Sequence, residues 1–333
     1  MKTIALLLGI ALSLLAQPAS AAEPRLTIEP LADGVFAFLP TDEALDSWRA
    51  VSNSGAIVLD DGVLIFDSHW TPSHVEEAGA LLRQHTDKPI RYVVNSHYHG
   101  DHTGGAWAYA KDVELITHHA TRERLRTYFD EVAEQLPGAV ERQAAQLETT
   151  TDEAERLRLE NVLHNQRDLL ARLEGGAAVP LPNLTFEAHV TLHRGRRVEI
   201  YFLGRGHTDG DAIVFLPQEK VAFCGDLLWN GGLPNIDDGY SEEWIATLEK
   251  ILQLGATRFI PGHGPVSSAD DVRALIAYLE WLRGAVAPYV RQGKGVDAAK
   301  EGIELPEQYA GYRFPWHFPR NIERVYAEIE DGR

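Results

Sequence analysis

The chain has 333 residues, of which 44% are hydrophobic and 24% charged; this balance is typical of a soluble globular protein and excludes disordered, collagen-like and polytopic membrane proteins. Acidic side chains outnumber basic ones by 49 to 31, and a net charge of −18 would repel a polyanion, so a nucleic-acid partner is excluded. The single cysteine, Cys224, can form neither an intramolecular disulfide nor a metal site rich in thiolates.

The N-terminal segment, residues 1–21, has the pattern of a signal peptide. Lys2 supplies a positive charge, residues 4–15 are uncharged and mostly apolar, and Ala19-Ser20-Ala21 has the small-x-small pattern of a cleavage site. The apolar stretch is shorter than the ~20 residues that span a bilayer, although a membrane anchor is the alternative. We expect cleavage after about Ala21, a periplasmic or secreted protein, and no integral membrane span in the rest of the chain.

Residues 22–333 predict a single domain of class α/β. In the first half, strands are expected at 34–39, 55–59, 63–66, 90–94 and 113–116, with a helix at 73–86. In the second half, strands are expected at 184–186, 189–192, 198–203, 212–216, 221–224 and 258–260, with helices at 242–253 and 268–285. Two similar halves of this kind predict a four-layer αβ/βα sandwich. No Gly-x-Gly-x-x-Gly motif follows an early strand, so a dinucleotide-binding fold has no support.

Residues 121–174 differ from both halves and predict a helical insertion. Pro137-Gly138 is expected to interrupt its first helix, and a second helix is expected to begin at Asp152 and to end at Gly175-Gly176. Two sets of apolar residues follow helical spacing: Leu125, Phe129, Val132 and Leu136, then Leu159, Val162, Leu163, Leu169, Leu170 and Leu173. This stripe packs on the domain, forms a homodimer contact, or covers the substrate as a lid; the sequence leaves these alternatives open.

Side chains that can bind a metal follow the strand at 90–94. Four of them fall within six residues: His97, His99, Asp101 and His102. On an extended or turning backbone, His97 and His99 can point the same way, while Asp101 and His102 lie at the expected start of a helix. Buried polar groups need partners, and four separate hydrogen-bond solutions at one strand end are improbable. We therefore interpret the group as metal ligands.

Three further candidate ligands follow other short apolar strands. His207 comes after the strand at 198–203, Asp226 after the strand at 221–224, and His263 lies within Pro261–Pro265. Each has a neighbouring glycine, which lets the backbone turn tightly. Because strand ends meet at an edge of the sandwich, we expect these side chains to converge with the first four.

Together the seven residues resemble the full five-motif set of the metallo-β-lactamase superfamily, over about residues 30–290. The resemblance implies two zinc ions per chain, one held by His97, His99 and His207, the other by Asp101, His102 and His263, with Asp226 bridging both. It also implies a hydroxide between the ions, which Asp101 orients. The implied function is an exported binuclear zinc hydrolase that attacks an ester, thioester, lactone or β-lactam-type carbonyl of a small molecule.

The chemistry of these residue types agrees with that function. Imidazole and carboxylate are ordinary ligands of Zn²⁺, at distances of about 2.0–2.2 Å. Coordination lowers the pKa of water from about 15.7 towards about 7, so that a nucleophile is available at neutral pH. Asp67 lies where the superfamily has a carboxylate that supports a ligand imidazole, although an aspartate that ends a strand in a turn is the alternative.

Two positions distinguish this chain from other branches of the superfamily. Asp226 occupies the position at which one lactamase subclass has a cysteine ligand, so Cys224 is interpreted as a packing residue. His99 disfavours flavodiiron chemistry, since those relatives have glutamate there. The alternative within the fold is an iron-dependent oxidoreductase similar to persulfide dioxygenases, with one iron at His97, His207 and Asp226. A zinc-dependent binding protein without activity is a third hypothesis.

For each candidate residue of the substrate-pocket wall, ordinary packing is the alternative to substrate contact. An aromatic-rich loop at 313–319 is expected to cover an edge of the fold. The other candidates for the pocket wall are Trp48, Arg49, Asn53, His69, Trp70, Tyr98, Trp229 and Asn230.

Overall fold

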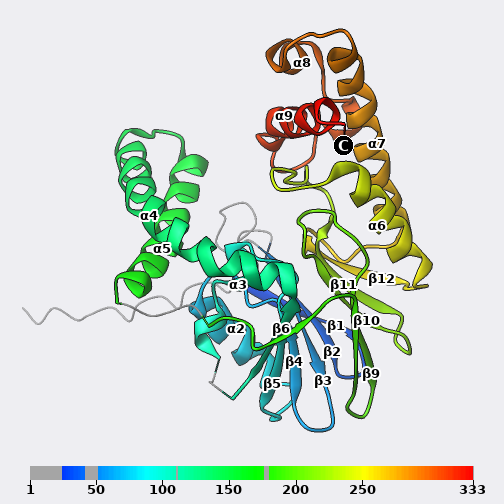
Figure 1. Ribbon diagram of the computed structural model, residues 1–333. Helices are drawn as coiled ribbons and strands as arrows, with labels where there is room; N and C mark the ends of the chain where they lie inside the picture. Colours follow the sequence, from blue (N-terminus) through cyan, green and yellow to red (C-terminus); the bar gives the residue numbers. More distant parts are fainter. Residues whose placement is uncertain (1–24, 42–51, 110–111, 176–179, 333) are drawn as a thin grey trace, which may run out of the picture.

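Two β-sheets pack face to face in the computed structural model, which describes residues 25–41, 52–109, 112–175 and 180–332 (Figure 1). The first sheet has seven strands in chain order, antiparallel from β1 to β4 and parallel from β4 to β7. These are β1 (Leu26–Ala32), β2 (Val35–Pro40), β3 (Ser54–Val58), β4 (Val63–Phe66), β5 (Ile90–Val94), β6 (Glu114–His118) and β7 (Leu184–Phe186).

The second sheet has five strands in the order β12-β11-β10-β9-β8. Its pairs are antiparallel except for β11 and β12, which run parallel. The strands are β8 (His189–His193), β9 (Arg197–Phe202), β10 (Ala212–Leu216), β11 (Val221–Trp229) and β12 (Arg258–His263).

Helices lie outside both sheets and complete the layers. The helices are α2 (Pro72–Leu82), α3 (Gly100–Thr103), α4 (His119–Thr149), α5 (Glu153–Glu174), α6 (Ser241–Gln253), α7 (Ala269–Arg291), α8 (Val296–Gly302) and α9 (His317–Glu330), with short 3₁₀ turns η1 (Ala106–Ala108) and η2 (Glu307–Tyr309). None of the described helices is both long enough and apolar enough to cross a membrane.

Successive side chains along each strand point to opposite faces of the sheet. Three apolar clusters result, one between the two sheets and one between each sheet and its helices, so the fold has four layers. In β4, Leu64 and Phe66 point between the sheets, whereas Ile65 packs in the cluster that contains residues of α2. In β11, Phe223 points between the sheets, whereas Cys224 packs among residues of α6, α7 and α9. Each large apolar side chain buried in this way stabilises the fold by about 1.5–3 kcal/mol. The predicted four-layer αβ/βα sandwich is therefore confirmed.

The structure differs from the predicted elements most clearly at three places. Pro137 does not interrupt the insertion, since α4 continues through it to Thr149. β11 does not end at Cys224 but continues to Trp229, because its pairing with β12 extends to Trp229 opposite His263. The C-terminal helices α8 and α9 were not predicted, although buried side chains such as Ile322 anchor them to α6 and α7.

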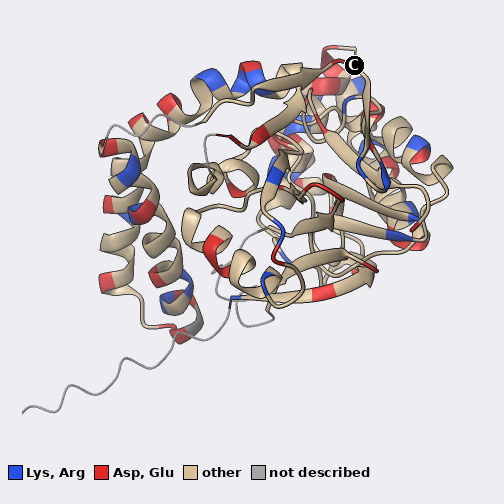
Figure 2. Cartoon of the chain, turned by 90° about the horizontal axis from the view of Figure 1, so that it is seen from below, with Lys and Arg blue, Asp and Glu red and all other residues tan. Residues whose placement is uncertain are grey.

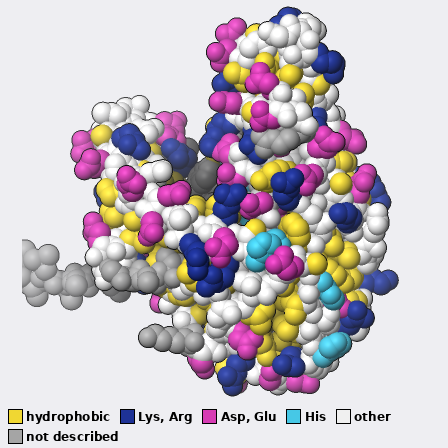
Figure 3. All heavy atoms as spheres, in the orientation of Figure 1, with side chains coloured by type: hydrophobic (Ala, Val, Ile, Leu, Met, Phe, Trp, Pro, Cys, Tyr) yellow, Lys and Arg dark blue, Asp and Glu magenta, His cyan; other side chains and the backbone are white. Residues whose placement is uncertain are grey.

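The insertion is an antiparallel hairpin of α4 and α5 (Figure 1). Asp152 caps α5 as predicted, because its carboxylate accepts a hydrogen bond from the Glu155 backbone at 2.8 Å. Acidic and basic residues are interspersed along the outer surface of the hairpin (Figure 2). The hairpin forms a lobe beside that of α7–α9, and a hollow separates the two lobes on the face seen in Figure 3.

Candidate metal centre

The seven predicted ligands converge at one edge of the sandwich. His97 and His99 lie in the loop after β5, and Asp101 and His102 lie in α3. The second sheet brings the other three: His207 in the loop between β9 and β10, Asp226 in β11 and His263 at the end of β12. Their ligand atoms form two groups, each within 4.8 Å: His97, His99, His207 and Asp226, and Asp101, His102 and His263.

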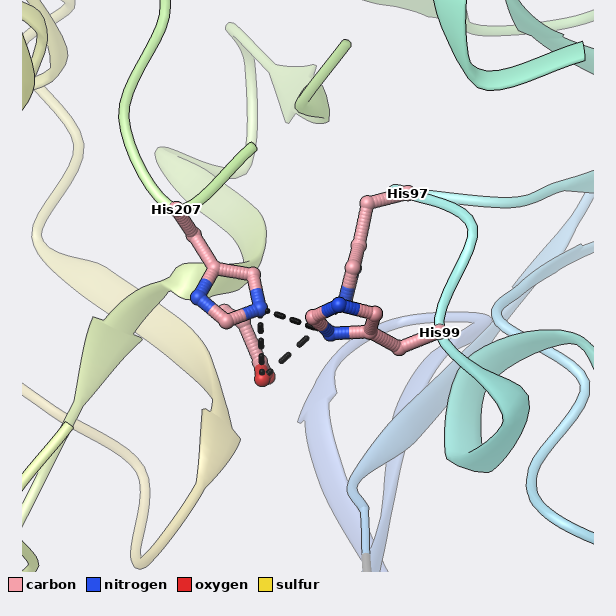
Figure 4. Close-up of side chains that lie close together, drawn as sticks. His97, His99 and His207 are labelled. Atoms are coloured by element: carbon pink, nitrogen blue, oxygen red, sulfur yellow. Dashed lines mark hydrogen bonds and ion pairs between the residues drawn. The ribbon is translucent and has the colours of Figure 1, made fainter. Parts of the chain in front are cut away.

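In the first group, three imidazoles face one carboxylate oxygen (Figure 4). Asp226 Oδ2 lies 3.4 Å from His207 Nε2 and 4.0 Å from His97 Nε2. His99 turns its Nδ1 inward, 2.9 Å from His207 Nε2. The inward nitrogen is thus Nε2 in His97 and His207 but Nδ1 in His99.

The second group faces the other oxygen of the same carboxylate. Asp226 Oδ1 lies 3.0 Å from His102 Nε2 and 3.3 Å from His263 Nε2. Asp101 Oδ2 lies 3.4 Å and 3.3 Å from the same two nitrogens. Asp226 is therefore placed between the two groups, with one oxygen directed to each.

Glycines next to the candidate ligands permit this approach. A Cβ atom on Gly262 would lie 1.8 Å from Asp226 Oδ1, so only glycine fits before His263. Gly225 has a φ of +54°, and a Cβ there would lie 2.6 Å from the Ser96 side chain. The glycines bring the backbones of β11, β12 and the loop after β5 close together.

The outward nitrogens of His102 and His207 are held by other groups. His102 Nδ1 donates to Asp67 Oδ2 at 2.7 Å, and Asp67 is itself fixed by the backbone N–H and hydroxyl of Ser96 at 2.7 and 2.8 Å. The expected contact between Asp67 and a candidate ligand imidazole is thus present. His207 Nδ1 donates to the carbonyl of Asn235 at 2.9 Å. Such contacts fix the tautomer and leave the inward nitrogen free to bind a metal.

Asp238 is a supporting residue that the sequence did not indicate. Its Oδ2 accepts a hydrogen bond from His99 Nε2 at 3.0 Å, which explains why His99 alone turns Nδ1 inward. The bond to His99 holds the pKa of Asp238 well below its ordinary value. Asp238 lies in an irregular loop and is 139 residues from His99 in the chain, so no local motif marks it.

Burial and charge set the protonation of the site. Burial lowers the pKa of His97 well below its ordinary value and that of His207 to about 3, so both imidazoles are neutral. Burial alone would raise the pKa of Asp226, but the attraction of His263, His102 and His207 outweighs it and lowers that pKa well below the ordinary value. Burial alone would lower the pKa values of His102 and His263, but Asp226 and Asp101 raise the first well above its ordinary value and the second to about 9. These two imidazoles must therefore lose a proton when a metal ion binds.

The donor set fits metal ions. His97 Nε2, His102 Nε2 and Asp226 Oδ1 are buried and have no hydrogen bond of acceptable geometry to any described residue. Such orphaned polar atoms are costly unless a ligand satisfies them. Imidazole nitrogens with carboxylate oxygens are typical zinc ligands, and the same set also suits iron.

Cys224 does not belong to either group. Its side chain is 1% exposed and packs in the apolar cluster against α6 and α7, where its thiol contacts the Ala222 carbonyl at 3.7 Å. Burial raises the pKa of the thiol well above its ordinary value. The interpretation of Cys224 as a packing residue is confirmed.

A cavity of about 350 Å³ opens beside the candidate ligands. Of the predicted pocket residues, Trp70 and Trp229 line it, and Phe314 and His317 of the aromatic-rich segment do so as well. Asn53 and His69 instead make buried hydrogen bonds, to the Pro261 carbonyl and to Ser54. Trp48 and Arg49 lie outside the described residues. The lining residues are Trp70, His99, Asp101, Gln143, Arg158, Val162, Asn165, Gln166, Asp226, Trp229, Asn235, His263, Phe314 and His317.

The hairpin has two roles in this arrangement. Leu125, Phe129 and Leu136 of α4 pack against Leu169 of α5, so most of the apolar stripe is used within the domain. Another face of the hairpin, which includes Val162, lines the cavity. The sequence offered packing, a homodimer contact and a substrate cover as alternatives. The structure shows packing together with a cavity wall, and the homodimer contact stays a prediction.

A model of the metallo-beta-lactamase superfamily matches residues 48–263 of the chain. The chain belongs to this superfamily. Members of the superfamily are hydrolases. The hairpin α4–α5 lies inside the matched region, whereas α7–α9 lie beyond it.

Curated relatives of the chain within the superfamily are distant. A linear primary-alkylsulfatase of Pseudomonas sp. (strain ATCC 19151) is 23% identical over 76% of this chain, but the match spans only 50% of that protein. A metallo-beta-lactamase type 2 of Pseudomonas aeruginosa is 24% identical over 68% of this chain and 72% of its own length.

Solved superfamily structures show the same fold. A metallo-beta-lactamase from Pontibacter korlensis has a TM-score of 0.54 and 19% identity, covering 77% of this chain and 99% of its own. The lactamase FIM-1 from Pseudomonas aeruginosa, in its mono-zinc form, has a TM-score of 0.55 and 17% identity, with coverage of 77% and 95%.

Proposed function

We propose that this protein is a binuclear zinc hydrolase that cleaves an ester, thioester, lactone or β-lactam-type bond at a carbonyl. The observation that carries the proposal is the position of Asp226, which directs one carboxylate oxygen to each of two complete donor groups. His97, His99 and His207 would hold one zinc, Asp101, His102 and His263 the other, and Asp226 would contact both. When bound, zinc supplies Lewis acidity, which activates a water and polarises the substrate carbonyl.

Side chains of the protein orient the attacking water and fix the tautomers of the candidate ligand imidazoles. Asp101 and Asp226 both line the cavity, but the Asp101 side chain is 16% exposed and that of Asp226 only 3%. Asp101 is therefore the carboxylate that can accept a hydrogen bond from the attacking water and keep its oxygen directed at the carbonyl. Asp67 and Asp238 hold the imidazoles in the tautomers that the site needs.

Aromatic rings form one wall of the cavity beside the candidate ligands. The Trp229 ring stacks on the His263 ring with centroids 4.1 Å apart, and Phe314 packs edge-on against Trp229. These rings shield one side of the donor groups and offer an apolar surface to the body of a small-molecule substrate.

An iron-dependent oxidoreductase similar to persulfide dioxygenases is the alternative. It would use one ion at His97, His207 and Asp226, and would leave the second group without a role. The completeness of Asp101, His102 and His263 as a second group favours the binuclear hydrolase.

Metal analysis and a substrate panel test the proposal. Purified protein is expected to contain about two zinc ions per chain and to hydrolyse at least one class among chromogenic lactams, lactones, thioesters and carboxylic esters. Sulfate esters belong in the panel because a relative is an alkylsulfatase. One iron per chain, with oxidation of a persulfide and no hydrolysis, would establish the alternative instead.

We also propose that the protein is exported. The segment that carries the expected signal peptide, residues 1–21, lies outside the described residues, as does the cleavage site at Ala21. The mature chain is expected to begin at Ala22, which mass spectrometry of the N-terminal peptide from a periplasmic or culture fraction would measure. Recovery of the intact Met1 peptide from that fraction would contradict export by cleavage.

A further inference from the structure

One face of α5 lines the same cavity as the candidate metal ligands. Arg158, Val162, Asn165 and Gln166 recur at a spacing of one helical turn, and all four line the cavity with His99 and Asp226. A helix inserted between β6 and β7 thus contributes a wall to the pocket in which the proposed hydrolysis takes place.

Arg158 places a guanidinium on this wall. It is the single lysine or arginine among the described residues that line the cavity. The chain as a whole carries a net charge of −18, so an anion needs a local cation in order to bind. A guanidinium in a partly enclosed site is well suited to bind carboxylate or sulfate oxygens through charge-assisted hydrogen bonds.

The guanidinium is held in a fixed orientation from behind. Arg158 Nε and Nη2 donate to the two carboxylate oxygens of Glu155 at 2.7 and 2.8 Å. The two side chains are 30% and 33% exposed, and Glu155 does not line the cavity. Two donors are used in this pair, which leaves the N–H groups of Nη1 available for a ligand.

The rest of the wall also favours a ligand with a polar group. Gln143 Oε1 and Gln166 Oε1 are buried and have no hydrogen-bond partner among the described residues, although both side chains line the cavity. Along α5, Val162 lies one helical turn from both Arg158 and Gln166, and Trp229 and Phe314 line the same cavity. The pocket thus combines an apolar surface for the body of a substrate with a polar, cationic wall.

We propose that the cavity selects substrates that carry an oxyanion, a carboxylate or a sulfate, apart from the bond that is cleaved, and that Arg158 binds this group. The proposal rests on the proposed function for the cleavage step alone. Arg158 is a specificity residue, and the hairpin is the segment that supplies the specificity.

Equilibrium binding to the zinc-loaded protein tests the proposal without turnover. Butyrate, which can occupy the metals only, is compared by calorimetry with glutarate and with 4-sulfobutyrate, each of which adds a second oxyanion. The sulfonate of 4-sulfobutyrate stands in for a sulfate ester, which the enzyme could cleave. Glutarate or 4-sulfobutyrate is expected to bind about ten- to hundredfold more tightly than butyrate, since hydrogen bonds to charged groups contribute strongly. The better of the two identifies the preferred oxyanion.

Three variants of α5 assign that preference. Arg158→Gln is expected to abolish it while leaving butyrate binding unchanged, and Arg158→Lys to restore part of it. Arg156→Gln is the matched control, because Arg156 lies on the same helix and pairs with Glu153 and Glu160 but does not line the cavity. Glu155→Gln leaves Arg158 in place without its fixed orientation and is expected to weaken the preference by a smaller factor.

The outcomes separate this inference from the proposed function. Equal affinity for the three ligands in the wild type, or a preference that survives in a folded, zinc-loaded Arg158→Gln variant, overturns the inference. If the Arg158 variants do not fold, the wild-type comparison and the Glu155→Gln variant still decide it. Failure of the substrate panel with an intact oxyanion preference overturns the proposed hydrolysis alone.

Discussion

Asp226 is the residue on which the geometry of the site depends most. Its two oxygens are within ion-pair distance of four imidazoles, which come from the loop after β5, from α3, from the loop between β9 and β10, and from β12. The glycine at position 225 and the glycine at 262 leave the space in which this carboxylate lies. Asp226 is the described carboxylate with one oxygen directed to each donor group, and a shorter side chain would reach neither group.

Asp226→Ala and Cys224→Ser form a matched pair, two residues apart in β11. Asp226→Ala is expected to lose at least one zinc and most of the activity, because both donor groups lose their shared carboxylate. Cys224→Ser is expected to keep both metals and most of the activity, while the hydroxyl buried in the apolar cluster lowers the free energy of unfolding by about 1–2 kcal/mol. Metal analysis, an activity assay and urea unfolding measure these effects, and the reverse pattern would make Cys224 the ligand.

Asp238→Asn tests the support of His99. The amide keeps the shape of the side chain but loses the charge that holds His99 Nε2 as a donor, so zinc affinity at the first group is expected to fall about 10- to 100-fold. Competition with a chromogenic chelator measures the affinity. Asp237→Asn is the control, because Asp237 pairs with Arg320 and not with a candidate ligand. Equal affinity in the two variants would show that Asp238 has no such role.

Among the residues of the site, those that belong to a short sequence motif were predictable, and those that contact the site only through the fold were not. His97, His99, Asp101 and His102 share one short motif, and the structure brings them together with His207, Asp226 and His263 as expected. Asn235 and Asp238 belong to a loop without periodicity, and their contacts to His207 and His99 span 28 and 139 residues. Only the folded chain reveals such partners.

The hairpin α4–α5 supplies one wall of the cavity, and its inner and outer halves contact different parts of the molecule. The first turns of α4 belong to the domain: Thr121 donates to the Gly210 carbonyl at 2.7 Å, and the Tyr128 hydroxyl accepts from the Gly100 backbone at 3.0 Å. The outer half carries Gln143 and Arg158, which line the cavity. A deletion that begins at residue 121 would thus remove support from the ligand-bearing loop.

A shorter deletion is the better test of the hairpin. Replacing residues 139–167 by a Gly-Ser linker keeps Leu136 and Leu169, which pack in the same cluster, and joins two helices that already lie side by side. Zinc content is expected to stay near normal, because every candidate ligand lies outside the deleted segment. The ratio of activities on anionic and neutral substrates is expected to fall. Loss of both zinc ions from a folded deletion variant would show that the hairpin holds the site together.

The errors in element boundaries have physical causes. A proline inside a helix costs about 3 kcal/mol, and Pro137 is tolerated in α4 where its neighbour Leu136 is buried against α5. The C-terminal helix α9 has one apolar face, with Ile322 and Val325 buried at helical spacing, so its periodicity was open to prediction and was overlooked. Tertiary contacts therefore explain the continuous α4, whereas α9 had a local signal in the sequence.

At the scale of the whole molecule, the candidate metal centre joins the two sheets. Four of its side chains follow β5 of the first sheet, and three come from β9–β12 of the second. Bound ions would therefore connect segments that are far apart in the sequence. A ligand that binds only the folded state stabilises it by mass action.

Removal of zinc is accordingly expected to lower the stability of the whole domain. With free zinc at about a thousandfold excess over its Kd, one site contributes about 4 kcal/mol to the free energy of unfolding. Calorimetry of the zinc-loaded protein and of chelator-treated protein is expected to show a lower Tm after treatment, restored when zinc is added back. Asp226→Ala, which lacks the shared carboxylate, is the control and is expected to show a smaller difference. An unchanged Tm in protein shown by metal analysis to have lost its zinc would mean that the two halves are held by apolar packing alone, and that the metals have a role in catalysis without one in stability.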